Sequence, residues 1–181
     1  MHSLDERFDP HLAQAEHLQT LFAAVNDEIF ANRESAMKVV GRLCAVNPAC
    51  VQPSLRKCLL QLIRELEHSG ASRNKEHAAR LLTAMVFSAP KFIQAYAEPL
   101  IRTLLPKLSS EPVVETTSVL VAVTACVGEL AQVAGPALQQ HVPTLFPLIL
   151  NMMQDTSNMK KREVRDRCCA SVGRCSDATV V

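Results

Sequence analysis

A pattern of paired apolar residues recurs along the chain and constrains its fold more than any other feature. Each copy has two adjacent apolar residues, two more one turn later, and a fifth after another turn. Such spacing places all five on one face of a helix. Successive copies begin 41, 42 and 45 residues apart, and only His17 in the weak first copy breaks the apolar rule. The copies are His17, Leu18, Leu21, Phe22, Val25; Cys58, Leu59, Leu62, Ile63, Leu66; Leu100, Ile101, Leu104, Leu105, Leu108; and Leu145, Phe146, Ile149, Leu150, Met153.

The segments between these stripes repeat as well, with intervals of 42 and 45 residues. A proline dipeptide closes each segment: Asn47-Pro48, Ala89-Pro90 and Gly135-Pro136. Because proline cannot continue a helix, each dipeptide predicts a turn between two helices. The matching apolar sets are Ala36, Val39, Val40, Leu43, Cys44; Ala78, Leu81, Leu82, Met85, Val86; and Val123, Cys126, Val127, Leu130, Ala131.

Two helices in a unit of 41–45 residues predict an all-α solenoid of HEAT type, with about three and a half antiparallel helix pairs. Armadillo repeats, which have a third short helix, are the alternative. The chain has only five Gly and no Trp, as a helix-rich fold would. Neither type of unit can bury its stripe alone, so stability would come from stacking.

We expect a HEAT array over residues 1–164, with units at 1–25, 27–68, 72–109 and 113–154 and a further unit starting at 157. The helices would span 10–25, 27–46, 49–68, 72–89, 91–109, 113–134 and 136–154, with Asp27, Ser72 and Ser157 as N-caps. Half-units at both ends suggest a segment of a longer array.

Four prolines fall within the second helices. Pro53 and Pro143 lie in the first two turns, where a missing amide costs little, and Pro99 and Pro147 lie where a kink or split of the helix is expected.

Seven cysteines in irregular spacing, without a CxxC pair, favour free thiols over disulfides or a zinc site. Cys44, Cys58 and Cys126 fall at apolar helical positions, where cysteine packs as a small hydrophobic residue. A net charge of +1 argues against nonspecific nucleic-acid binding. The apolar run Val119–Val123 is too short to span a membrane. We therefore expect a soluble, cytoplasmic protein.

No catalytic, cofactor-binding or metal site is predicted. The sequence lacks a G-x-S-x-G elbow, an H-E-x-x-H pair and a glycine-rich phosphate loop. His17 is interpreted as a partly buried structural histidine. Glu65 and Glu67 near His68 are interpreted as a solvated helix end rather than an acid–base site.

Two basic clusters, Arg56-Lys57 and Lys160-Lys161-Arg162 followed by Arg165 and Arg167, are interpreted as solvated faces. Their alternative is a docking patch for an acidic partner or RNA. No aromatic residues interleave with these charges, so base stacking has little support.

Several short runs resemble the amino-terminal HEAT region of the target-of-rapamycin (TOR) kinases, and the likeness covers about residues 3–164. The runs are Ser3–Asp9, His11–Glu16, Asn26–Glu28, Val40–Leu43, Asn47–Ala49, Leu55–Lys57, Leu66–Gly70 and Gly128–Val133. The resemblance implies a fragment of a very large serine/threonine kinase of the phosphatidylinositol-3-kinase-related class. In that family the solenoid holds regulatory subunits (Raptor-like), packs against other HEAT repeats and the kinase region, and dimerises the complex. The parent protein would be cytoplasmic and associate with lysosomal, vacuolar or other endomembranes. No kinase motif maps onto this chain, so it would be scaffold and not an enzyme.

The sequence departs from the family pattern near its end. Arg165 takes the register position of Ala36 and Ala78, a small buried site, where an unpaired charge would cost several kcal/mol, on the order of 3–5. We therefore expect residues 165–181 to be aberrant or disordered, through a misread exon boundary or frame.

Two other functions fit helical repeats. A transport or phosphatase-scaffold adaptor would expose acidic loops or regular Asp/Arg ladders, which the near-neutral sequence does not suggest. An RNA-binding repeat module would show salt-dependent nucleic-acid affinity.

Overall fold

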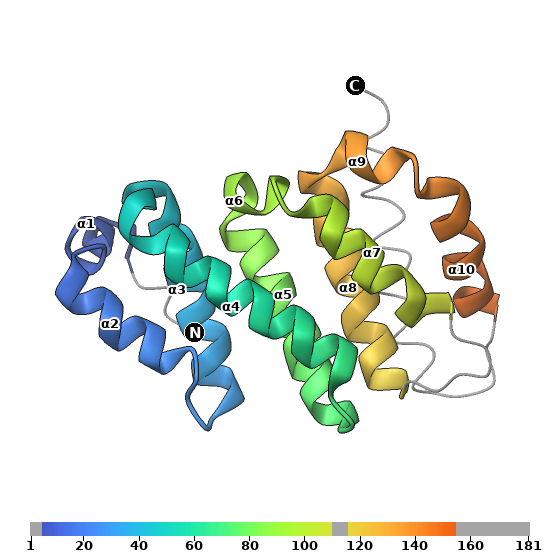
Figure 1. Cartoon of the computed structure of the whole chain (residues 1–181), viewed down its shortest axis with the longest axis horizontal. Helices are drawn as coiled ribbons and strands as arrows, with labels where there is room; N and C mark the ends of the chain where they lie inside the picture. Colours follow the sequence, from blue (N-terminus) through green and yellow to red (C-terminus); the bar gives the residue numbers. More distant parts are fainter. Residues whose placement is uncertain (1–4, 110–115, 155–181) are drawn as a thin grey trace.

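A computed structural model describes residues 5–109 and 116–154, and every regular element within them is helical (Figure 1). The all-α solenoid predicted from the repeat is confirmed. The elements are η1 (Glu6–Phe8), α1 (Asp9–Leu12), α2 (Ala15–Ala24), α3 (Phe30–Val46), α4 (Pro48–His68), α5 (Ser72–Ser88), α6 (Pro90–Gln94), α7 (Ala97–Ser109), α8 (Thr117–Val133), α9 (Gly135–Gln139) and α10 (Val142–Gln154).

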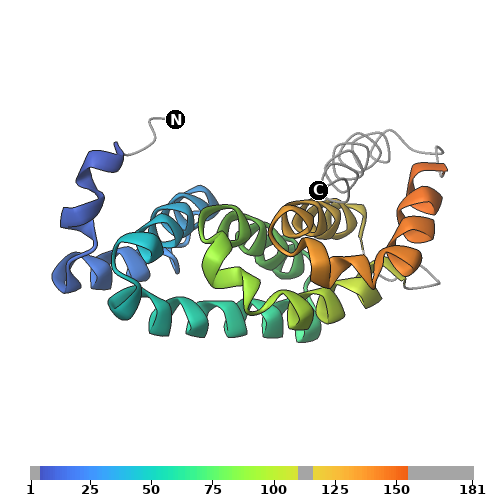
Figure 2. The ribbon, with the colours of Figure 1, turned by 90° about the horizontal axis from the view of Figure 1, so that it is seen from above.

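The helices form two layers, seen from above in Figure 2. The first layer holds α3, α5 and α8, with α5 packed between the other two. The second layer holds α4, which packs on α3 and α5, and α7, which packs on α8. Each second-layer helix thus covers first-layer helices with its apolar stripe.

The predicted first-layer stripes are confirmed at all positions. Every member of the three sets, from Ala36 to Ala131, is buried, and Val40, Leu82 and Leu130 have no exposed surface. Since burying an aliphatic side chain stabilises by about 1.5–3 kcal/mol, these positions dominate the core.

The second-layer stripes are confirmed only in part. Leu59, Leu66, Leu100 and Leu104 are fully buried. Phe146, however, is 53% exposed, and His17 is exposed rather than partly buried. Both residues lie on helices near the ends of the described array, where fewer helices are available to cover them.

Three of the predicted helices are divided. The leading helix breaks at Ala13–Gln14, the 91–109 helix at Ala95–Tyr96, and the 136–154 helix at Gln140–His141. The split expected near Pro99 is confirmed. At Pro147, where a kink or split was expected, the helix does not split: the break precedes Pro143, and α10 continues through Pro147, so the kink remains a prediction. A proline in the first turn of a new helix lacks only an amide that has no helical partner there, so the break falls just before Pro143.

These splits bear on the armadillo alternative. The units that begin with α5 and α8 each contain three helices, whereas α3 and α4 form a simple pair. The short helices α6 and α9 are the first turns of divided second helices. The division of the chain into repeat units remains a prediction.

The N-caps predicted at Asp27 and Ser72 are wrong in detail. Asp27 accepts hydrogen bonds from the Ile29 amide at 2.7 Å and the Asn32 side chain at 3.2 Å, but Ile29 occupies the N-cap of α3. Ser72 is already inside α5, and the N-cap Ala71 has no side chain that can accept the bond. Sequence reasoning missed Asn47, which caps α4 by accepting from the Cys50 amide at 3.4 Å.

Gly41 allows α3 and α5 to approach closely. A Cβ added there would lie 2.7 Å from the Cβ of Ser88, closer than real carbon contacts allow. At the same edge of the layer, Asp9 is 5% exposed and forms a two-pronged ion pair with Arg42, in which the Nε and Nη2 atoms donate at 2.7 Å each. This pair attaches α1 to α3.

The predicted free cysteines are present at Cys44, Cys50, Cys58 and Cys126. Cys44 and Cys126 are buried as expected, while Cys58 is half-buried and Cys50 is exposed. Met153, Ser157, Lys160 to Arg162, the cysteines beyond residue 160 and the expectation for 165–181 lie outside the residues whose side chains are described.

Candidate interaction groove

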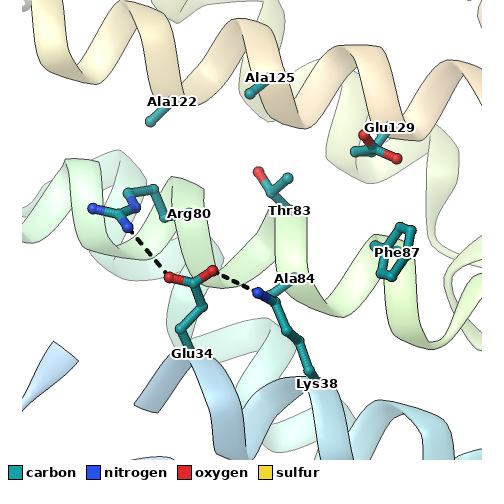
Figure 3. A pocket seen from close by; sticks show the side chains of 9 residues that line it. All are labelled: Glu34, Lys38, Arg80, Thr83, Ala84, Phe87, Ala122, Ala125 and Glu129. Carbon is teal, nitrogen blue, oxygen red and sulfur yellow. Dashed lines mark hydrogen bonds and ion pairs between the residues drawn. The ribbon is translucent and has the colours of Figure 1, made fainter. Parts of the chain in front are cut away.

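A groove of about 320 Å³ crosses the outer face of α5 and is walled by α3 and α8 (Figure 3). The stack of first helices positions its lining side chains, since each contributing helix turns the same register face outward. The groove residues are Glu34 and Lys38 from α3; Arg80, Thr83, Ala84 and Phe87 from α5; and Ala122, Ala125 and Glu129 from α8.

A short ladder of charges occupies one side of the groove. Glu34 accepts from the Lys38 ammonium at 2.8 Å within α3, and from Nη2 of Arg80 at 3.2 Å across to α5. Arg80 also lies 3.9 Å from Glu76. One guanidinium thus joins carboxylates from two successive repeats.

The environment of Glu34 keeps this ladder ionised. Burial favours the neutral acid, but the hydrogen bond and charge of Lys38, together with the charge of Arg80, outweigh it, so the pKa of Glu34 lies below its ordinary value. At neutral pH the groove therefore presents a paired carboxylate and two cations with little local net charge.

An aromatic contact supports the guanidinium from behind. The Arg80 Cζ atom lies 4.4 Å from the ring centre of Phe30, and Phe30 stacks on His77 with ring centres 4.2 Å apart. Burial lowers the pKa of His77, and the nearby charges of Arg73 and Arg33 lower it further. The ring of Phe30, supported by His77, holds the guanidinium of Arg80 at the groove.

Apart from Glu129, the other side of the groove is apolar or small. Phe87 is 70% exposed, and Ala122 and Ala125 form the facing wall on α8. Beneath this wall Cys126 is completely buried, which raises its pKa to about 12 despite the opposing effect of a hydrogen bond with Thr83. An exposed ring beside fixed charges resembles the composition of protein interfaces, in which aromatic and arginine residues are enriched.

The groove residues offer binding chemistry rather than a reaction. Its hydroxyl, Thr83, donates to the Ala79 carbonyl at 2.9 Å and faces no histidine base in the groove. Among residues 5–109 and 116–154, no group of three or more His, Cys, Asp or Glu side chains gathers as a metal site would. The sequence predictions that no catalytic, cofactor or metal site exists remain predictions for the whole chain.

The structure keeps the other residues considered from sequence apart from this groove. Glu65 and Glu67 lie at the end of α4, where they accept from Gln61 at 3.0 Å and Thr103 at 3.1 Å, and His68 is exposed beside Glu67. Arg56 and Lys57 are exposed on α4, as predicted. His141 contacts Glu98 at 3.2 Å, a link between α7 and the α9–α10 junction.

Sequence reasoning missed the groove, although a signal was present. Glu34 and Lys38 recur 42 residues later as Glu76 and Arg80, so an acid–base pair occupies the same helical face in two units. This pairing contains no Asp and covers α3 and α5 alone, so it does not overturn the expected lack of regular Asp/Arg ladders that argued against an adaptor. In the third unit Val121 and Ala125 replace the pair, which ends the ladder.

The described residues define a helical-repeat protein with a groove across its first layer. No protein-family model matches the chain. It is 42% identical to the serine/threonine-protein kinase mTor of Drosophila melanogaster over 166 residues, which cover 91% of this chain and 7% of that protein. It is 41% identical to the serine/threonine-protein kinase TOR2 of Saccharomyces cerevisiae over 161 residues (88% of this chain, 6% of the relative), and 40% identical to the serine/threonine-protein kinase TOR of Arabidopsis thaliana over 158 residues (87% and 6%).

The chain is therefore homologous to a segment of the TOR serine/threonine kinases, as the resemblance predicted. It spans about 7% of the length of the Drosophila relative. None of the helices in the described ranges combines the length and apolar character that crossing a membrane requires.

Proposed function

We propose that this chain is a non-catalytic HEAT-repeat scaffold segment of a TOR-type kinase, supporting regulatory-subunit binding and complex assembly in growth and nutrient signalling. The observation that carries the proposal is the 40–42% identity to TOR kinases over about nine-tenths of the chain. The stacked helix layers support it, because a solenoid offers a long surface for many weak contacts.

In the same proposal, the segment packs against neighbouring HEAT repeats and the kinase region, and contributes to a dimeric complex. That complex would be cytoplasmic and associate with endomembranes. The groove on α5 is the surface proposed to contact a Raptor-like regulatory subunit, since Phe87 could anchor the contact while Arg80 and Glu34 set its polar register.

A matched pair of phenylalanines tests the proposal by pull-down with the regulatory subunit. Phe87→Ser should reduce capture about tenfold, the scale of an interface anchor. Phe146→Ser, which alters a 53% exposed ring on α10, should leave capture unchanged. Equal capture by both variants would remove the groove from the proposal, and no capture by the unaltered chain would reject regulatory-subunit binding.

Calorimetry with magnesium-ATP tests the non-catalytic part separately. Phosphoryl transfer needs a lysine on the phosphates, magnesium ligands and a base on the acceptor hydroxyl. The described helices gather no such set, so we expect no heat of binding. Micromolar nucleotide binding would overturn the scaffold assignment.

An adaptor of the transport or phosphatase-scaffold class is the second candidate, favoured only by the Glu34–Lys38 and Glu76–Arg80 ladder. This function requires that a cargo protein or a phosphatase subunit binds the chain and that the TOR regulatory subunit does not.

A further inference from the structure

The exposed face of α4 carries a stripe of cations around one apolar residue, in the layer opposite the groove. Arg56, Lys57 and Arg64 are all exposed, and Leu60 between them is 48% exposed. We call these four residues the α4 stripe. Arg56, Leu60 and Arg64 are spaced by four residues, so they line up over about 12 Å of helix.

The cations of the α4 stripe are unpaired in the described part of the chain. Some other cations there, by contrast, have carboxylate partners: Lys38 and Arg80 bind Glu34, and Arg102 binds Glu98 at 2.9 Å. Near the stripe, Glu65 and Glu67 are engaged by Gln61 and Thr103 instead. The stripe therefore keeps three charges available to an outside partner.

The next second-layer helix shows that this is a local feature and not a property of the repeat. One unit later, 42 residues on, Glu98 takes the place of Arg56 and Arg102 takes the place of Leu60. These two residues form an ion pair within α7. The same face is thus self-neutralised on α7 and positively charged on α4.

We propose that the α4 stripe binds an acidic helical segment of a partner protein, with carboxylates about two turns apart flanking an apolar residue that packs on Leu60. The three cations favour an acidic partner. The exposed side chain of Leu60 between them favours a protein over a nucleic acid, because it offers an apolar contact. α4 contains no Phe, Tyr or Trp on which a base could stack. The stripe is a second surface, separate from the groove and independent of which subunit the groove contacts.

The test is titration of the 181-residue chain with a synthetic acetylated helical peptide carrying glutamate pairs one turn before and one turn after a central leucine. Binding should weaken about tenfold when Arg56, Lys57 and Arg64 are all changed to Gln, and also when salt rises from about 50 to 500 mM, because the contacts are exposed charges. Leu60→Ser should weaken binding less, without changing the salt dependence.

A matched control removes the same charge elsewhere. Arg73→Gln, Lys91→Gln and Arg102→Gln together change three exposed cations on α5, α6 and α7, and should leave affinity unchanged. Circular dichroism of each variant verifies that the helices remain. Equal weakening by both triple variants, no binding of the peptide, or binding of single-stranded RNA in its place at this stripe would each overturn the proposal. Failure here leaves groove capture of the regulatory subunit unaffected, so the two outcomes are distinguishable.

Discussion

The two layers of the solenoid follow the same repeat but bury very different shares of their helices. In the first layer α8 buries ten of its 17 residues, whereas in the second layer α4 buries five of 21. The cause is position: α8 packs against α5, α7 and the short helices α6 and α9, while the outer face of α4 is exposed. Most positions of a first-layer helix are therefore constrained by packing, whereas a second-layer helix has exposed positions that binding residues can occupy.

Helix continuity differs in the same direction. Helices α3, α5 and α8 each run for 17 residues without a proline, whereas Pro53, Pro106 and Pro147 lie inside α4, α7 and α10. Proline removes one backbone hydrogen-bond donor and leaves a helix carbonyl without its partner. Water can bond to that carbonyl on an exposed helix, but not between two packed helices. The comparison thus explains where the repeat tolerates irregularity.

The largest expected difference between the layers is in cysteine reactivity. Burial in α8 raises the pKa of Cys126 to about 12, whereas Cys50 is exposed at the start of α4. Since the thiolate is the reactive form, Cys50 should be alkylated at pH 8 at least about a hundredfold faster. Peptide mapping after iodoacetamide treatment measures both sites in one sample. Similar alkylation rates would mean that the helices around α8 do not shield Cys126 from solvent.

A pair of leucine truncations compares the layers in free energy of unfolding. Leu82→Ala in α5 should destabilise by about 3–5 kcal/mol, because its side chain has no exposed surface. Leu60→Ala in α4, where the side chain is 48% exposed, should cost less than about 0.5 kcal/mol. Urea unfolding followed by circular dichroism gives both values, and losses of the same size would contradict the difference in burial.

A pair of aspartates tests the polar edge of the first layer. Asp9→Ala leaves Arg42 without its buried partner and should cost about 2–3 kcal/mol. Asp5→Ala removes an exposed contact to Arg7 and should leave the free energy of unfolding almost unchanged, because water screens exposed ion pairs. If thermal unfolding shifts equally in both variants, α1 is not attached to α3 through this pair.

A pair of glycines gives the smallest expected effect. Gly41→Ala forces α3 away from Ser88 and should destabilise by about 1–2 kcal/mol, after the gain in helix propensity is included. Gly70→Ala meets nothing within 4 Å and should change stability by no more than about 0.5 kcal/mol. A stabilised Gly41→Ala variant would show that the close contact between the two helices can relax freely.

The repeat made the first layer predictable because its burial is set by local helical spacing alone. All fifteen register positions follow from intervals in the sequence, and the Asn47-Pro48 turn follows from proline stereochemistry. The exposure of Phe146 depends on how many helices surround α10, which periodicity does not encode. The groove was missed because the contact between Glu34 and Arg80 crosses between repeats, which the pattern within one helix does not show.

Amide hydrogen exchange tests directly whether the continuous first layer is the structural core of the described helices. We predict the slowest exchange in α5, followed by α3 and α8, with faster exchange in the short α6 and α9 and at the junctions Ala95–Tyr96 and Gln140–His141. Protection in α6 and α9 equal to that in α5 would contradict it.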